Sequence, residues 1–119
     1  MFNKLKNAVG ESALKSAIEK YSHRIAEKLP EIAALKAADV LDDARYRSIV
    51  VAPALAKVVA ASNGATGLIP EFNERFARAM LHLRNELVTI DEVSQQVSLV
   101  PGYEARVSEV LLEGFRQRG

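Results

Sequence analysis

The sequence predicts an all-α protein, built as a compact bundle of five to seven short-to-medium helices. Apolar residues recur every three or four positions over almost the whole chain, as they do on one face of an α-helix. No stretch of five residues alternates apolar and polar side chains between turn signals, as a half-buried strand would. The length of 119 residues suits one domain. The absence of Cys excludes disulfides and thiolate zinc sites.

The first long helix is expected after Gly10, and its apolar residues form one stripe. Pro30 falls within this stripe, and proline cannot donate the backbone hydrogen bond of a helix interior. The pattern therefore predicts either a kinked helix or a tight turn into a second helix with Pro30 at its first position. The stripe consists of Leu14, Ile18, Tyr21, Ile25, Leu29, Ile32 and Leu35.

Helices are also expected on both sides of Pro53. Asp39 can cap a helix that begins near Val40. A further helix follows Pro53 and runs to Ser62. The Asn-Gly-Ala-Thr-Gly sequence at 63–67 is the clearest loop in the chain and a candidate hinge.

The best-defined helix is expected from Pro70 to about Val88. Ala77, Leu81 and Val88 form a second apolar strip about 120° round this helix from its main stripe. A helix with two apolar strips lies at the centre of a bundle or faces a partner. The main stripe consists of Phe72, Phe76, Ala79, Met80, Leu83 and Leu87.

Two helices joined by a turn are expected after Val88. Thr89 and Glu92 have the spacing of a capping box, which predicts a helix that ends at Val97. The Pro-Gly-Tyr sequence at 101–103 marks the start of the last helix, which runs through Phe115.

This pattern, with the small Ser94 in the first helix, resembles the helix-turn-helix of bacterial transcription regulators of the arabinose-regulator class. The resemblance implies a small DNA-binding regulator that uses residues 89–113. The second helix would enter the major groove of DNA. Gly102, Ala105 and Arg106 would then face the bases.

The charge distribution makes a nucleic-acid partner the less favoured alternative. The formal net charge is +1, and the chain from Leu68 onward carries six Arg against eight acidic residues. A protein that binds DNA needs a local surplus of positive charge to meet the phosphates. The other interpretation of residues 89–113 is a helical hairpin that only packs.

The two histidines are candidates for metal ligands, because each precedes a glutamate by four residues. His23 with Glu27 and His82 with Glu86 would share a helix face. Both histidines point away from the apolar stripe of their helix, so surface pairs are expected instead of a metal site. No phosphate-binding loop or nucleophile motif is present. We expect no enzymatic activity, no cofactor and no small-molecule substrate.

Residues 1–10 are expected to form a separate amphipathic segment, ahead of a single helical domain at 11–119. Its apolar residues are helically spaced but would project about 160° away from the later stripe. The segment also carries Lys4 and Lys6 and no acidic residue. Packing on a partner protein is expected, and weak attachment to an anionic membrane surface is the alternative. The apolar residues are Phe2, Leu5 and Val9.

No segment of the chain has the pattern of a signal sequence or a membrane span. A secretory signal needs an apolar run of about 7–15 residues behind its basic residues. A transmembrane helix needs roughly 20 predominantly apolar residues. We therefore expect a soluble, cytoplasmic protein.

The expected function is a non-enzymatic protein–protein interaction module that associates with itself. Apolar faces beyond what one small bundle can bury indicate a partner. A symmetric homodimer is the simplest way to cover them. The residues expected to contact the partner are Phe2, Leu5, Val9, Leu81 and Val88.

Overall fold

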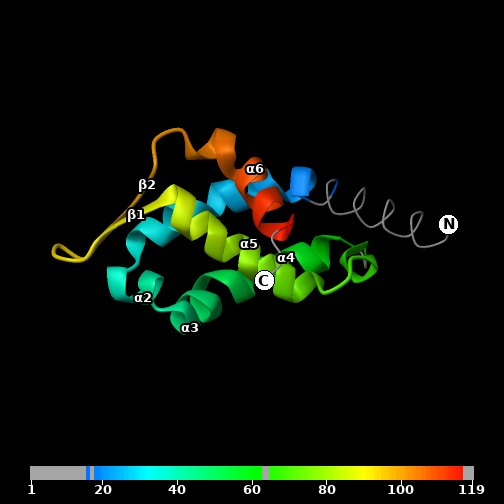
Figure 1. The fold of residues 1–119 in the computed structure, drawn as a ribbon, viewed down its shortest axis with the longest axis horizontal. Coiled ribbons are helices and arrows are strands. Elements are labelled where there is room, and N and C mark those ends of the chain that lie inside the picture. Colours follow the sequence, from blue (N-terminus) through cyan, green and yellow to red (C-terminus); the bar gives the residue numbers. More distant parts are fainter. Residues whose placement is uncertain (1–15, 17, 63–64, 117–119) are drawn as a thin grey trace.

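The computed structural model describes residues 16, 18–62 and 65–116, which form a mainly α-helical bundle with one small β-hairpin (Figure 1). The predicted helical class is confirmed. The predicted segment 1–10 lies outside the described residues, as do Asn63 and Gly64 of the candidate hinge. The described remainder of the hinge belongs to the short 3-10 helix η3 (Ala65–Leu68).

The first described helix covers residues 18–28 and continues into the 3-10 helix η1 (Leu29–Ala34). Pro30 lies in the first turn of η1, where a missing N–H costs no hydrogen bond. A second helical element therefore begins here, as one of the two predicted alternatives has it, but no turn precedes it and Pro30 is its second residue. The stripe residues Ile18, Tyr21, Ile25, Leu29 and Ile32 are buried.

The middle of the chain forms one nearly continuous helical run after a short helix. The short helix is α2 (Ala37–Leu41), and the run comprises α3 (Asp43–Tyr46), η2 (Arg47–Val51) and α4 (Ala52–Ala61). η2 is a π-helical segment, and Pro53 lies in the first turn of α4. The wider π turn accommodates a proline that cannot donate to the carbonyl four residues back. The predicted interruption at Pro53 is therefore a local widening of the helix.

The helix cap in this region is Asp42 and not Asp39. The Oδ1 atom of Asp42 accepts a hydrogen bond from the backbone N–H of Arg45 at 3.0 Å. Asp39 lies inside α2, which begins at Ala37, so the predicted helix start near Val40 is wrong.

The centre of the bundle is the contact between α5 (Phe72–Leu87) and α6 (Tyr103–Arg116). The six residues of the predicted α5 stripe are all buried. The rings of Phe72, Phe76 and Phe115 form a cluster with centroids 5.5 to 6.1 Å apart. Gly114 lets the two helices approach closely, because a Cβ at this position would lie 2.6 Å from the Cα of Ala79.

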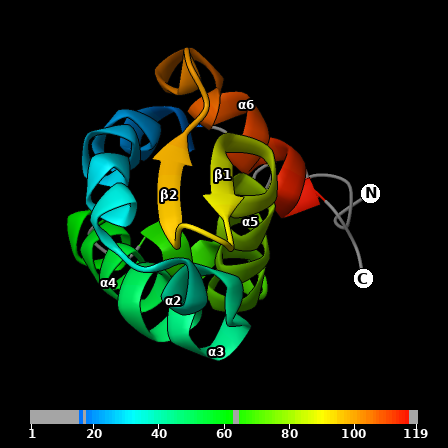
Figure 2. The ribbon, with the colours of Figure 1, turned by 90° about the vertical axis from the view of Figure 1, so that its left-hand side faces the viewer.

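Residues 88–99 form an antiparallel β-hairpin instead of the predicted helix. β1 (Val88–Asp91) pairs with β2 (Gln96–Leu99), so that Val88 lies opposite Leu99. Figure 2 shows β2 on the side of the helix of residues 18–34 and β1 on the side of α5. The predicted helix from Thr89 to Val97 is wrong, and the helix-turn-helix therefore lacks its first helix. The predicted last helix is confirmed as α6.

The side chain of Asp91 stabilises the turn between the two strands of the hairpin. Its Oδ1 atom accepts hydrogen bonds from the backbone N–H groups of Val93 at 3.0 Å and Ser94 at 3.3 Å. Gln95 completes the turn with a φ of 61°. The run Val88-Thr89-Ile90 is β-branched and favours an extended backbone. The four-residue strands are too short to show alternation in the sequence.

We predict that Gly114→Ala destabilises the fold by about 1–3 kcal/mol, because the new methyl group overpacks the α5–α6 contact. Helix propensity alone would change stability in the opposite direction, by about 0.5–1 kcal/mol. Urea unfolding measures the difference. Glu109→Ala at an exposed position of α6 is the control and should change stability by less than about 0.5 kcal/mol. A more stable Gly114→Ala protein would contradict the close approach.

We predict that the hairpin turn loosens in acid. Hydrogen bonds from Ser94 and Val93 hold the pKa of the Asp91 carboxyl below its usual value. The folded pKa is below the unfolded one, so the stabilisation is present above about pH 4 and is lost as the pH falls through the folded pKa. The amide resonances of Val93 and Ser94 should shift over this range. Asp91→Asn keeps an acceptor oxygen but cannot titrate, so an unchanged titration in that variant would contradict the assignment.

Candidate functional site

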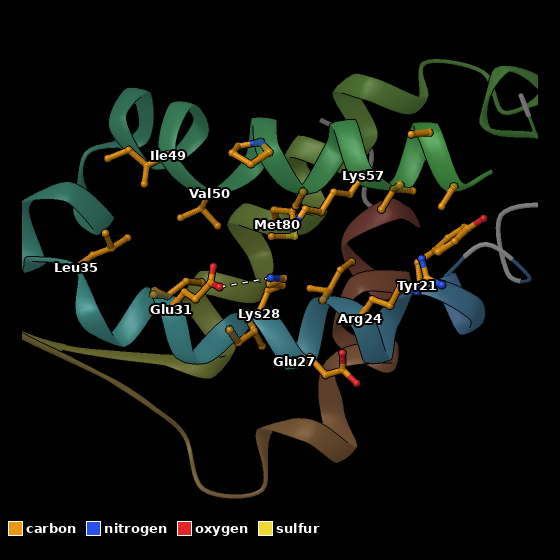
Figure 3. A pocket seen from close by; sticks show the side chains of 18 residues that line it. Tyr21, Arg24, Glu27, Lys28, Glu31, Leu35, Ile49, Val50, Lys57 and Met80 are labelled. Carbon is orange, nitrogen blue, oxygen red and sulfur yellow. Dashed lines mark hydrogen bonds and ion pairs between the residues drawn. The ribbon is translucent and has the colours of Figure 1, made fainter. Parts of the chain in front are cut away.

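A groove of about 750 Å³ opens between the helix of residues 18–34 and the η2–α4 run (Figure 3). One wall extends from Tyr21 to Leu35 and the other from Ile49 to Ala61, while Met80 of α5 contributes from beneath. Ligand pockets in proteins commonly have volumes of about 300–1,000 Å³. The hollow therefore has the size of a binding site.

The apolar lining follows from helical spacing on both walls. On the first wall the lining residues recur every three or four positions, as they do along one face of a helix. The same spacing recurs on the second wall, so each wall has one apolar ridge. Most of the first ridge is buried at the base of the groove, whereas Leu35, Val50 and Ala54 are half-buried at its surface. The first ridge consists of Tyr21, Ile25, Leu29, Ile32 and Leu35, and the second of Val50, Ala54, Val58 and Ala61.

Charged side chains lie along the rims of the groove. Arg24, Lys28, Glu27 and Glu31 come from the first wall and Lys57 from the second. The Nζ atom of Lys28 lies 3.5 Å from Oε1 of Glu31. Figure 3 shows Glu27 pointing away from α4. Lysine and arginine can line such a groove with their apolar stems while their charged ends stay in water.

Tyr46 connects the second wall to α5. Its hydroxyl donates a hydrogen bond to the backbone carbonyl of Met80 at 2.8 Å. Burial raises the pKa of Tyr46 far above its usual value, although Arg84 offsets part of this effect, so the hydroxyl stays protonated. The guanidinium of Arg84 lies 5.2 Å from the centre of the Tyr46 ring. It donates hydrogen bonds to the backbone carbonyl of Val40 at 3.0 Å and to Oδ1 of Asp43 at 2.8 Å.

Of the residues predicted to contact a partner, the two that the structure describes, Leu81 and Val88, do not line the groove. Leu81 and Val88 are half-buried and pack against the core, so the bundle itself covers much of the second strip of α5. Phe2, Leu5 and Val9 lie outside the described residues.

The residues predicted to face DNA lie at the start of α6. Gly102, Ala105 and Arg106 are exposed there. The Nη2 atom of Arg106 is 3.8 Å from Oε2 of Glu86. Since residues 88–99 are a hairpin, these side chains do not belong to a helix-turn-helix.

The two histidines lie in different surroundings. His23 is exposed. His82 is half-buried between α5 and α6, and its Nε2 atom is 3.7 Å from Oε1 of Glu113. The predicted partner Glu86 lies 3.8 Å from Arg106. Within residues 16, 18–62 and 65–116, no three His, Asp or Glu side chains cluster closely enough to hold a metal ion. In this same part of the chain, no helix has the length and apolar character to cross a bilayer.

The groove itself was not predicted from the sequence. The predicted stripe contains one wall, from Tyr21 to Leu35. The apolar residues around Pro53 supply the other. No signal in the sequence shows that these two faces lie opposite each other across open space.

No family model, no curated protein and no solved structure matches this chain.

We predict that Tyr46→Phe lowers the free energy of unfolding by about 1 kcal/mol, because it removes the hydrogen bond to the Met80 carbonyl. Chemical denaturation measures the change. Tyr21→Phe is the matched control, since no hydrogen bond of its hydroxyl is found among the described residues. Equal losses in the two variants would contradict the role of the Tyr46 hydroxyl.

Proposed function

We propose that the protein is a non-enzymatic interaction module whose groove binds a helix of a partner protein. The observation that supports this proposal is the apolar groove between two helical walls. Each wall presents side chains at the spacing of three and four residues that interlocks with the ridges of another helix. Recognition of a helix in a groove uses the same geometry, with apolar anchors on one face of the bound helix.

The length of the groove suits a short helix. The first wall extends over the fourteen residue steps between Tyr21 and Leu35. At about 1.5 Å per residue in the α-helical half and about 2.0 Å in the 3-10 helix η1, this corresponds to about 24 Å, or just over four turns of a bound α-helix. A partner helix of this length would place apolar anchors at positions i, i+4, i+7 and i+11.

The lining supports binding over catalysis. Its charged groups are lysine, arginine and glutamate side chains on the rims, and the described part of the chain contributes no His, Ser, Thr or Asp to it. General acid–base and nucleophilic catalysis need titratable or nucleophilic groups to converge on one reacting atom. The two glutamates do not converge, because Glu27 points away from α4 and Glu31 lies beside Lys28. An apolar floor with charged rims instead resembles the layout of a protein interface.

We predict that a cross-linked helical peptide of about 14 residues, with Leu at the four anchor positions and Gln elsewhere, binds saturably in fluorescence anisotropy. Ile49 lines the groove and is 44% exposed, whereas Val59 on the same helical run is 39% exposed and lies outside it. Ile49→Glu should weaken binding about tenfold or more, a loss of about 1.4 kcal/mol. Val59→Glu is the matched control and should leave the affinity unchanged.

Absence of saturable binding, or equal effects of the two glutamate variants, would overturn the proposal. Light scattering on the same samples tests the predicted homodimer separately. A dimer that Ile49→Glu converts to a monomer would identify a second copy as the source of the bound helix.

A further inference from the structure

The charges on the rims distinguish between kinds of partner helix. We infer, on the basis of the proposed function, that the groove selects an acidic amphipathic helix from another protein. Such a helix would insert its apolar face between the walls and place carboxylates along both edges of that face.

Positive charges come from both rims of the groove. Arg24 and Lys28 are four residues apart on the first wall, so they lie on the same face about one helical turn apart. Lys57 lies on the opposite wall. A helix between the walls would therefore meet cations along each of its edges.

Among the described residues that line the groove, three cations face two glutamates, which leaves a surplus of one positive charge. Glu31 is close to Lys28, at 3.5 Å, and Glu27 points away from α4 (Figure 3). Arg24 and Lys57 have no ion pair or hydrogen bond with any residue in the described part of the chain. These two cations are available to the carboxylates of a bound partner.

The same charges make the chain's own N-terminal segment a poor occupant. Residues 1–10 have helically spaced apolar residues, but they carry Lys4 and Lys6 and no acid. Placing these lysines beside Arg24, Lys28 and Lys57 brings like charges together. Complementary charge speeds association and rejects wrong partners, so an acidic helix from another protein is favoured.

Three peptides with the same leucine face test this selectivity. One carries Glu on both edges of that face, one carries Gln and one carries Lys. In anisotropy titrations at about 50 mM salt we expect the Glu peptide to bind roughly tenfold more tightly than the Gln peptide, and the Lys peptide more weakly than both. The differences should shrink at about 500 mM salt because ions screen the exposed charges.

Charge-removing variants locate the effect on the groove. Replacing Arg24, Lys28 and Lys57 by Gln should reduce the affinity for the Glu peptide to or below that for the Gln peptide, because Glu27 and Glu31 remain and Glu31 loses its partner Lys28. The affinity for the Gln peptide should not change. The matched control replaces three exposed cations that do not line the groove, namely Lys20, Lys36 and Arg47. It removes the same total charge and should retain the preference.

Each of the other possible results of these titrations would contradict the charge selectivity or the proposed groove. Equal binding of the three peptides would leave the docking groove in place and overturn its charge selectivity. Binding of none of them would overturn the proposed function as well. If the control variant loses the preference equally, the effect comes from total charge and not from the groove. A peptide of residues 1–10 that binds most tightly would identify the chain's own segment as the occupant and overturn the inference.

Discussion

The backbones of α5 and α6 can approach so closely only because residue 114 is a glycine. A Cβ there would meet the Cα of Ala79. This close approach lets the rings of Phe72 and Phe76 from α5 meet Phe115 from α6. Overpacking of a dense interior is costly, so the position tolerates little else. α5 thereby becomes the fixed element against which the other helices are placed.

The groove results from the way its two walls attach to the bundle. The second wall is joined to α5 through the Tyr46 hydroxyl, and Arg84 of α5 adds a charged hydrogen bond to Asp43. The first wall is held elsewhere, where η1 packs against β2. The hairpin is not part of a DNA-binding motif, and it supports this wall instead. The backbone carbonyl of Gln95 in the hairpin turn accepts a hydrogen bond from the backbone N–H of Ala37. Each wall has its own anchorage, which leaves an open space between them.

The nearly balanced total charge of the chain conceals an uneven local distribution. The formal net charge is +1, yet the cations of the groove come from both rims while one of its two carboxylates points away. In the C-terminal part, Arg106 and Arg84 have carboxylate neighbours within the chain. Position in the fold, and not charge count, therefore decides which cations are available to a partner.

The sequence by itself determined the helical class, the buried stripes from Ile18 to Ile32 and along α5, and the change of helix geometry at Pro30. These features depend on periodicity and backbone hydrogen bonding within a few residues of each other. Between Thr89 and Val97, the capping-box spacing and the β-branched residues indicated opposite structures. Only the tertiary structure shows that this segment is a hairpin. The Asp91 side chain caps its turn, and η1 packs against its second strand. It also decided the groove, because the distance between two helices depends on contacts each makes with distant parts of the chain.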